Sequence, residues 1–446
     1  MPDPPTTELK RSMTLVPATA LVVGTIIGAS IFVQPSEITA LVPSVGGVAA
    51  IWLVAGILTF FGALVSAELA SAFPRTGGVY VFLNETYSPV LGFLWGWAMF
   101  WSMHSGILAA IAVVFARYVA FFVPLSPVGV QLVAAGAILV LSAINYRGIE
   151  HGSRLQTAFT VGKVAAIALM IAVGLVLAPG EAASTTSVSA PAAAVASTPI
   201  TWTAIVRALI AGLFAFGGWH MVTYAAGETV DPTRTIPRAL LGGTVIVTIC
   251  YIALNAVYMY VLPMDVVISS SRVAADAADA LLGSGGAGLM SGLVIFSTFG
   301  ALNGIVLAGP RVYYSMAQDG LLFNWAGRAH PTFRTPHLAI VLQGVWASVL
   351  VFTGTYSQLF SRVIYVEWVF FGLMALGLFI LRRRPDYTPA YRVRGAAVIA
   401  GVFALSSAII LLNRFLTEPV EAVIGLGIVL LGVPVYYFWL ARPKGA

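Results

Sequence analysis

A succession of long apolar stretches constrains this chain more than any other feature. Hydrophobic residues make up 59% of its 446 residues and charged residues only 9%, whereas soluble domains carry about 25% charged residues. A helix needs about 20 apolar residues to cross the hydrocarbon core of a bilayer. We count twelve such stretches, separated by short polar turns or by turns rich in Gly and Pro. The sequence therefore predicts an all-α polytopic membrane protein.

The expected spans occupy nearly the whole chain. In order, they are 13–39, 47–73, 89–122, 128–146, 155–177, 203–226, 239–262, 285–316 with a bend near Pro310, 338–352, 363–381, 396–416 and 419–440. Residues 179–199 consist mostly of Ala, Ser, Thr and Pro, a composition typical of a flexible linker. A polar tail, 1–12, precedes a first span that is too long for a cleaved signal peptide.

Two spans contain glycine-rich interruptions, Gly-Thr-Ile-Ile-Gly-Ala-Ser over 24–30 and Phe-Ala-Phe-Gly-Gly-Trp-His over 214–220. A helix broken inside the membrane exposes backbone N–H and C=O groups, which hydrocarbon tolerates only where protein or a water-filled cavity satisfies them. The amides that begin the following half-helix favour an anion, and the carbonyls that end the preceding one favour a cation. Paired interruptions therefore predict a binding site for a small zwitterion near the bilayer midplane.

The distribution of basic residues predicts the orientation. Most Lys and Arg residues lie in segments that would share one side with the N-terminus. The other side holds only Arg117, Arg207, Arg272, Arg362 and Arg414. Since cytoplasmic loops carry an excess of positive charge, we expect both termini in the cytoplasm and the chain in the cell (inner) membrane.

Several other chemistries find no support in the sequence. The single cysteine, Cys250, excludes an intrachain disulfide, and no cysteine lies on an expected external loop for a disulfide-linked subunit. The 5 histidines lack metal-ligand spacing, and no nucleophile and base mark an enzyme site within a span. Basic residues are dispersed rather than gathered on one face, unlike those of a nucleic-acid-binding surface. We expect no metal, cofactor, nucleic acid or covalent partner.

Several motifs carry a family resemblance. They are Glu68-Leu69, Phe-Pro-Arg-Thr-Gly-Gly-Val-Tyr at 73–80, the stretch 214–219 with Glu228, Pro232 and Ile236-Pro237, Asn303-Gly304, Arg311, Thr335-Pro336, and the segments 381–385 and 432–437. Over 13–440 the chain resembles the amino acid-polyamine-organocation superfamily, and most of all its L-type amino acid transporter branch. The resemblance implies the LeuT-type fold, with inverted repeats of five helices over 13–178 and 203–382, a linker over 179–202, and two further helices over 383–446.

The resemblance also carries substrate-binding roles onto the two interruptions. The backbone amides that hold the substrate carboxylate would be those of Gly28, Ala29 and Ser30. The carbonyls that receive its ammonium group would be those of Ile26, Phe214 and Gly217. Ser30 stands where relatives usually have glycine, so the backbone there either avoids positive φ or is strained.

The second interruption supplies the expected gate and side-chain pocket. Phe214 would cover the site as an outer gate, and Trp219 would shape the pocket for the substrate side chain. His220 replaces the small amide or polar residue common at this position, which bears on selectivity for that side chain.

Lys163 lies deep inside an expected span, nine residues or roughly 13 Å beyond Arg154, which marks the cytoplasmic end of that span. An ammonium at that depth needs a partner or loses its proton. Sodium-coupled members of this fold bind an ion between helices 1, 5 and 8, and the Gln156, Thr160, Lys163 spacing resembles a tethered substitute for it. Ala308 and Gly309 are the residues we place where helix 8 hydroxyls would ligate sodium. Both observations predict sodium independence, against the alternative of a lysine that only serves packing.

Three further polar residues have two interpretations each. Glu68 is either an inner gate that pairs with a loop or a solvated interfacial carboxylate. Glu367 could act at an outer gate, and His104 could carry protons or serve as a hydrogen-bonded packing residue.

We expect a sodium-independent secondary transporter of neutral amino acids that works by alternating access, as an exchanger or with protons. No acidic residue falls within either interruption, so nothing there would pair with a cationic side chain. A cationic amino acid or polyamine transporter is the main alternative. A membrane-embedded enzyme and a non-transporting amino acid sensor are alternatives from other classes.

Overall fold

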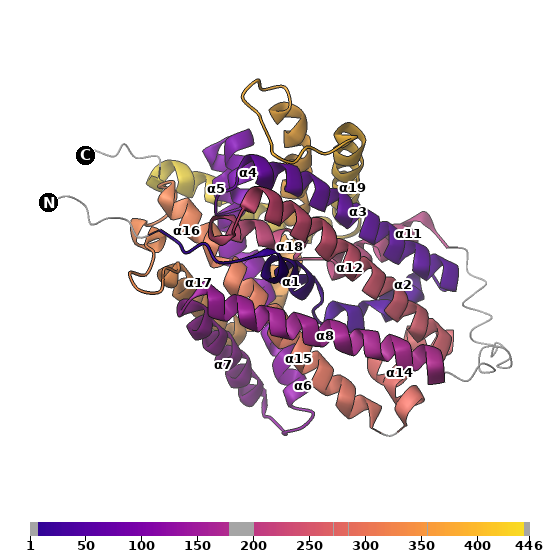
Figure 1. Cartoon of the computed structure of the whole chain (residues 1–446). Coiled ribbons are helices and arrows are strands. Elements are labelled where there is room, and N and C mark those ends of the chain that lie inside the picture. The colour runs from indigo at the N-terminus through magenta and orange to yellow at the C-terminus, as the bar shows by residue number, and fades with distance from the viewer. Residues whose placement is uncertain (1–7, 178–199, 271, 284, 355, 441–446) are drawn as a thin grey trace.

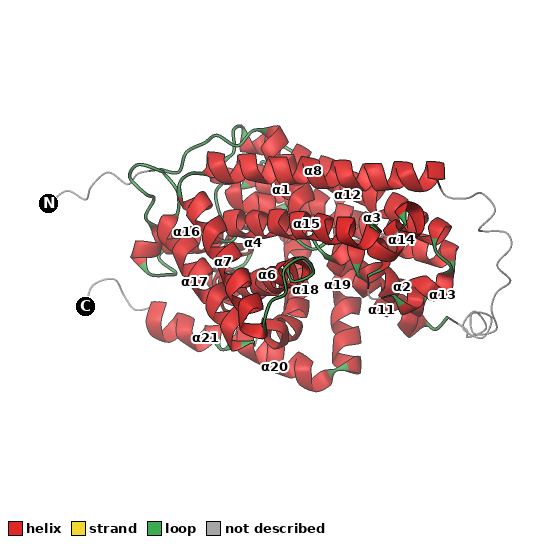
Figure 2. Ribbon diagram, turned by 90° about the horizontal axis from the view of Figure 1, so that it is seen from below, coloured by secondary structure: helices red, strands yellow, loops and turns green. Residues whose placement is uncertain are grey.

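The protein is a bundle of helices packed around one interrupted helix. The computed structural model describes residues 8–177, 200–270, 272–283, 285–354 and 356–440, and no strand occurs within these ranges (Figure 2). The elements are α1 (Leu15–Ile26), η1 (Ser30–Phe32), α2 (Gln34–Leu41), α3 (Val45–Ala72), α4 (Val79–Thr86), α5 (Pro89–Ala98), η2 (Met99–Met103), α6 (His104–Val119), α7 (Pro127–Tyr146), α8 (Ile149–Leu177), α11 (Trp202–Ala215), η3 (Trp219–Glu228), α12 (Pro232–Val261), α13 (Met264–Ser269), α14 (Val273–Leu282), α15 (Gly286–Ala308), α16 (Pro310–Gln318), η4 (Asn324–Gly327), α17 (His337–Thr353), α18 (Tyr356–Leu381), α19 (Ala396–Thr417), α20 (Pro419–Leu430), α21 (Gly432–Val435) and η5 (Tyr436–Leu440).

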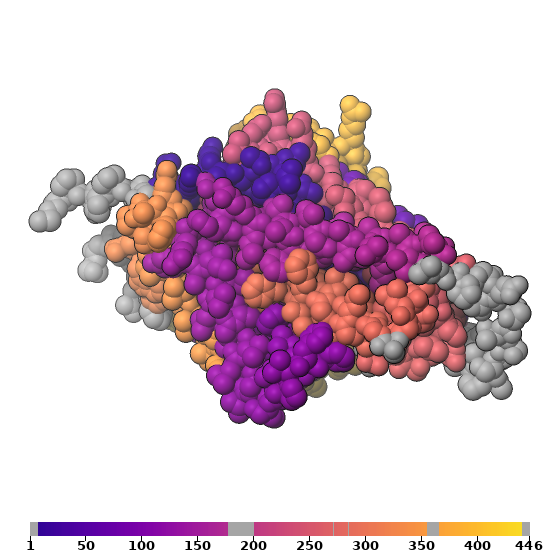
Figure 3. All heavy atoms as spheres, turned by 60° about the horizontal axis from the view of Figure 1, so that its bottom comes forward, coloured from indigo at the N-terminus to yellow at the C-terminus, as the bar shows by residue number. Residues whose placement is uncertain are grey.

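The helices have the length and surface of membrane spans. In the described ranges, 9 helical stretches are long and apolar enough to cross a bilayer, and shorter apolar helices cover Leu15–Ile26, His337–Thr353 and Tyr365–Leu381. Figure 3 shows α8, in magenta, running across the surface above α14 and α15. The side chains of Val161 and Leu169 on α8 are 61% and 65% exposed. Apolar side chains on the outside and polar ones inside are the pattern of a protein solvated by lipid. The count of twelve spans and the inverted repeat stay predictions.

The first interrupted span lies at the centre of the bundle. Around α1 pack α8, α12, α15 and η3, and α12 packs against both α3 and α8 where these long helices cross the molecule (Figure 1). We call the side that holds Met13 and Arg382 the termini side, and the side that holds Leu177 and Trp202 the linker side. This central position surrounds the interrupted backbone with protein on all sides.

Several helices begin before hydropathy predicts or lie in segments expected to be loops. The helix α12 begins at Pro232 rather than near 239, because proline is tolerated at the first helical position while Arg234 and Arg238 lower the hydropathy of its first turns. The helix α8 likewise begins at Ile149. The short helix α4 lies within the expected loop 74–88, and α13 and α14 lie within the expected loop after 262. These three helices have only 6 to 10 residues and include polar ones, so they escape a search for spans of about 20 apolar residues.

Candidate functional site

The first interruption is present where glycine predicts it. The helix α1 ends at Ile26, and the next turn, η1, begins at Ser30. Hydrogen bonds from Phe32 N to Ala29 O (3.0 Å) and from Val33 N to Ser30 O (3.1 Å) close that turn. The first amides of a helical turn have no intrahelical partner, so the amide of Ser30 is free of the turn. Ser30 is absent from the residues with positive φ, so its backbone avoids the strained conformation.

Two expected binding groups of this segment already have intramolecular partners. The amide of Gly28 donates to the carbonyl of Ile26 at 2.8 Å. The same carbonyl accepts a hydrogen bond from the Tyr251 hydroxyl at 3.1 Å. The amides of Ala29 and Ser30 are therefore the best-placed donors for a carboxylate in this conformation.

The second interruption separates α11 from η3. Phe216 leaves the helical conformation with ψ 0°, and Gly218 adopts the left-handed conformation with φ 99°. A Cβ atom at Gly218 would lie 3.1 Å from the carbonyl oxygen of Thr25. Glycine is required here both for its φ and for the close approach of the two broken backbones.

Two hydroxyl groups tie the interruptions together. The Tyr251 hydroxyl on α12 lies 3.1 Å from Ile26 O and 3.0 Å from Ala215 O, and the Thr25 hydroxyl donates to Gly218 O at 3.2 Å. The sequence does not predict either contact, because a single Tyr or Thr in an apolar span does not indicate which carbonyl its hydroxyl binds. The two interrupted segments thus form one unit.

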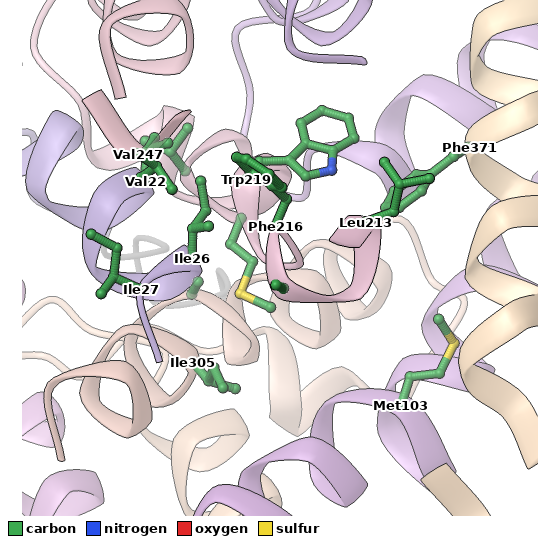
Figure 4. Close-up of a cluster of buried hydrophobic side chains, with 14 of the residues drawn as sticks. Val22, Ile26, Ile27, Met103, Leu213, Phe216, Trp219, Val247, Ile305 and Phe371 are labelled. Atoms are coloured by element: carbon green, nitrogen blue, oxygen red, sulfur yellow. The ribbon is translucent and has the colours of Figure 1, made fainter. Parts of the chain in front are cut away.

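A cavity of about 100 Å³ adjoins the second interruption. Its lining includes the expected site residues Phe214, Gly217, Trp219 and His220. The four expected residues of the first interruption do not line it. Figure 4 shows Ile26 and Ile27 at the end of α1, next to the segment that carries Phe216 and Trp219. Further lining residues come from α6 and α18, namely His104, Ile107, Glu367, Trp368 and Phe371, and Met103 from η2.

A second, larger cavity lies on the linker side of the first. Its volume is about 650 Å³, and its lining includes Gln34, Glu37, Arg207 and Asn413. Both cavities share Phe214 as a lining residue, together with Ile210, Tyr365 and Ile410. Phe214 therefore lies between this second cavity, which we call the vestibule, and the first, which we call the inner cavity.

Helix α18 brings an acidic side chain to the inner cavity. The Glu367 carboxylate lies 3.6 Å from His220 Nε2, and the two side chains are 14% and 1% exposed. Neither interrupted segment contains an acid, as the sequence indicates, but packing supplies one from another helix. An acid that could pair with a cationic side chain therefore lies at the cavity, although none lies within the interruptions.

Lys163 on α8 lies directly against the first interruption. Its ammonium group donates to Gly24 O (3.1 Å), Ile27 O (2.7 Å) and Ser297 O (3.0 Å), and its side chain is fully buried. One turn and two turns earlier on α8, Thr160 and Gln156 donate to Ala20 O at 2.9 Å and 3.5 Å. The three polar residues of α8 thus bind the carbonyls of Ala20, Gly24 and Ile27, at α1 and directly after its end.

The part of α15 that faces Lys163 differs from the expected one. Ser297 and Gly300 lie next to the ammonium group. The expected Ala308 and Gly309 lie about 16 Å further along the helix at 1.5 Å per residue, and Gly309 faces Gln343 and His104 instead. The Ser297 hydroxyl donates to Ile27 O and Gly28 O at 3.3 Å each. A hydroxyl is therefore present on this helix, although the ammonium group already occupies the space between α1, α8 and α15.

Glu68 pairs with a loop on the termini side. Its buried carboxylate binds Arg382 Nε at 2.8 Å and Nη2 at 2.5 Å, and accepts from Val393 N at 2.7 Å. The bond to Glu68 raises the pKa of Arg382 above its ordinary value. Of the two expectations for this residue, loop pairing is the one observed, and simple interfacial solvation is wrong.

A further pair on the termini side involves Asp319. Its carboxylate accepts from the Tyr80 hydroxyl at 2.7 Å and from Arg75 Nη1 at 3.1 Å.

His104 lies at the inner cavity with its ring centroid 5.6 Å from that of Tyr224. Neither of its ring nitrogens has a hydrogen-bond partner among the described residues, so the hydrogen-bonded packing interpretation is wrong in this conformation.

Comparison with known proteins places this geometry in a family. A family model described as "Amino acid permease" matches residues 13–438. The "Large neutral amino acids transporter small subunit 2" of Mus musculus is 32% identical over 98% of this chain and 83% of its own length. The "Serine/threonine exchanger SteT" of Bacillus subtilis is 32% identical over 96% of this chain and 97% of its own length. The "b(0,+)-type amino acid transporter 1" of Homo sapiens is 30% identical over 99% and 90%. This chain belongs to the amino acid permease family, whose relatives here are transporters resident in membranes.

Proposed function

We propose that the protein exchanges neutral amino acids across the cell membrane by alternating access, without sodium. One observation carries the proposal, namely that two interrupted spans meet beside a small cavity and are tied by the Tyr251 hydroxyl. Half-helix ends that meet in a bilayer present dipoles of both signs, which matches the two charges of an amino acid. The names of the similar transporters support neutral substrates and exchange.

The site roles follow from the two interruptions. The amides of Ala29 and Ser30 would bind the carboxylate, with Gly28 joining once its bond to Ile26 opens. Carbonyls of Ile26, Phe214 and Gly217 would receive the ammonium group. Phe214, which lines both cavities, would separate substrate from the vestibule, and Trp219 and His220 would contact its side chain.

Lys163 supports independence from sodium. An ammonium group bound to three carbonyls of α1 and α15 supplies the positive charge that a bound cation would bring. Because the charge is covalently held, no ion gradient is needed to fill the position. The neutral substrate would then move by exchange against an internal amino acid.

The orientation and the partners extend the proposal. The termini side, which carries the ion pairs of Arg75 and Arg382, would face the cytoplasm, since basic residues are concentrated there. The vestibule would then open to the outside. Cys250 lies within α12 and is the only cysteine of the chain, so a disulfide to another subunit would have no external cysteine to use.

Reconstituted exchange tests the proposal. Proteoliposomes loaded with unlabelled amino acids should take up labelled L-alanine or L-serine at the same rate in sodium and in choline buffer. Lys163→Ala should lower this rate by about tenfold or more, which corresponds to a barrier that is higher by about 1.4 kcal/mol. Val161→Ala, a lipid-facing control on the same helix, should leave it unchanged. Uptake that requires sodium, or full activity of Lys163→Ala, would overturn the coupling argument.

A cationic substrate is the second candidate, and Glu367 at the inner cavity is the observation that favours it. Competition of L-lysine or a diamine against labelled L-serine separates the two candidates. A non-transporting sensor would bind these amino acids but show no counterflow.

A further inference from the structure

The inner cavity has a polar wall inside an aromatic enclosure. His104, His220 and Glu367 line it from α6, η3 and α18. We call these three residues the polar wall. The rings of Trp95, Trp219, Tyr224 and Phe371 surround His220, with centroids between 4.9 and 5.9 Å from its own. The cavity therefore presents polar side chains to which an aliphatic substrate side chain could form no hydrogen bond.

The polar wall has unused hydrogen-bonding groups. His104 and His220 are 2% and 1% exposed, and none of their ring nitrogens has a hydrogen-bond partner among the described residues. The 3.6 Å between His220 Nε2 and the Glu367 carboxylate exceeds a hydrogen bond. Buried polar atoms are rarely left in this condition unless water or a ligand bonds to them. A molecule bound in the cavity would supply the partners that the two imidazole rings lack.

We infer that the polar wall is a subsite for a small, uncharged, hydrogen-bonding side chain, so that hydroxyl or amide amino acids are selected over aliphatic ones of equal size. The inference rests on the proposed function and specifies its substrate class. A hydroxyl or amide both donates and accepts, as neutral imidazole and a carboxyl group together require.

Size and charge both favour this class over a cationic side chain. The inner cavity is small, with a volume of about 100 Å³ against about 650 Å³ for the vestibule, which favours a short side chain over a long one. Glu367 is 14% exposed and lies beside a fully enclosed imidazole, an environment in which a carboxyl group keeps its own proton and needs no cation from the substrate. The surrounding rings exclude the water that would otherwise stabilise an added charge.

L-Serine and L-alanine form a matched substrate pair, since they differ by one hydroxyl. A site built to bond a hydroxyl rejects the analogue without it, because its own buried groups are then left unpaired. In exchange assays with proteoliposomes, the wild-type rate for labelled L-serine should exceed that for labelled L-alanine by about tenfold or more. The ratio is measured within one preparation, so it does not depend on protein yield.

Substitutions in the polar wall should change the ratio rather than the rate alone. Glu367→Leu and His220→Leu should each bring the serine to alanine ratio close to one while alanine exchange continues, and Glu367→Gln should retain part of the preference. Asp265→Asn, an exposed acid on α13, is the matched control and should keep the wild-type ratio.

The outcomes separate this inference from the proposed function. If no labelled amino acid exchanges in the wild type, the proposed function itself fails. If L-alanine and L-leucine exchange as fast as L-serine, or if the substitutions lower both rates equally, only the polar subsite is overturned. If L-lysine competes better than L-serine, the cavity takes a cation and the inference is wrong.

Discussion

Arg311 and Glu228 form a bidentate ion pair that is completely buried. The distances are 2.6 Å from Arg311 Nε to Glu228 Oε2 and 3.0 Å from Nη2 to Oε1, and both side chains are 0% exposed. Glu228 ends η3, and Arg311 lies at the start of α16, just after the bend at Pro310. The Arg311 guanidinium also donates to the carbonyl of Leu307. The pair therefore joins the second interrupted span to the bent span beside it.

Removing one partner of this pair should destabilise the protein strongly. Arg311→Met leaves the Glu228 charge buried without a partner, which costs about 3–5 kcal/mol. The apparent melting temperature of purified protein in detergent should fall accordingly. Lys10→Met breaks the exposed pair with Glu150 and should leave the melting temperature nearly unchanged, because exposed ion pairs contribute little.

A double substitution distinguishes the charge effect from lost packing. Glu228→Gln with Arg311→Met removes both charges, so it should be more stable than Arg311→Met alone. If the double variant is the less stable of the two, the destabilisation comes from packing and not from an unpaired carboxylate.

Much of the fold could be predicted because its signals are local. Apolar length marks a span, and glycine within a span marks an interruption, so the breaks near Gly28 and Gly217 need no knowledge of neighbours. Helix starts such as Pro232 and the interfacial helix α4 were missed because their polar residues hide them from hydropathy. The position of Ala308 relative to Lys163 was wrong because the register between two helices depends on their packing.

The site could be predicted only where one segment carries it. Phe214, Trp219 and His220 line the inner cavity, since they belong to the second interruption itself. Glu367 and Tyr251 reach the site from helices far away in the sequence. No periodicity or motif in the spans that contain Glu367 and Tyr251 indicates which neighbouring helix these side chains face.

Replacing Gly24 or Gly218, the glycines at close contacts of the two interrupted spans, by alanine should impair both folding and transport. A Cβ atom at Gly24 would collide with Gln156 and Thr160 of α8, and alanine at Gly218 would be strained at φ 99°, at a cost of about 1–3 kcal/mol. Gly242→Ala is the control, because nothing lies within 4 Å of its added Cβ. Thermal stability and amino acid exchange should fall for Gly24→Ala and Gly218→Ala only. Equal behaviour of all three variants would show that the close backbone contact is unimportant.

The hydroxyl of Tyr80 should stabilise the closed termini side in a pH-dependent way. Burial raises its pKa above the ordinary value, and the bond to Asp319 acts in the same direction. A pKa that is higher in the folded state gives stability that is present below the unfolded pKa of 10.0 and is lost as pH rises above it. Tyr80→Phe should therefore cost about 1.5–3 kcal/mol at neutral pH, and the difference from wild type should shrink above about pH 10. Melting temperatures of the two proteins across this range provide the measurement, and a difference that grows with pH would contradict the assignment.

Phe214 should control access from the vestibule to the inner cavity. It lines both cavities, whereas Ile107 lines only the inner one. A cysteine at Ile107, in a Cys250→Ser background, would report access because no other cysteine is present.

Phe214→Ala should increase the rate at which a membrane-impermeant thiol reagent labels this cysteine from outside by about tenfold, as expected when a barrier falls by 1.4 kcal/mol. Leu405→Ala, an exposed apolar residue on α19, provides the control and should leave the labelling rate unchanged. Labelling that is already fast with Phe214 in place, or that does not respond to its removal, would mean that the side chain is not the barrier between the two cavities. Retained exchange with a faster labelling rate would instead assign the ring to gating rather than to substrate affinity.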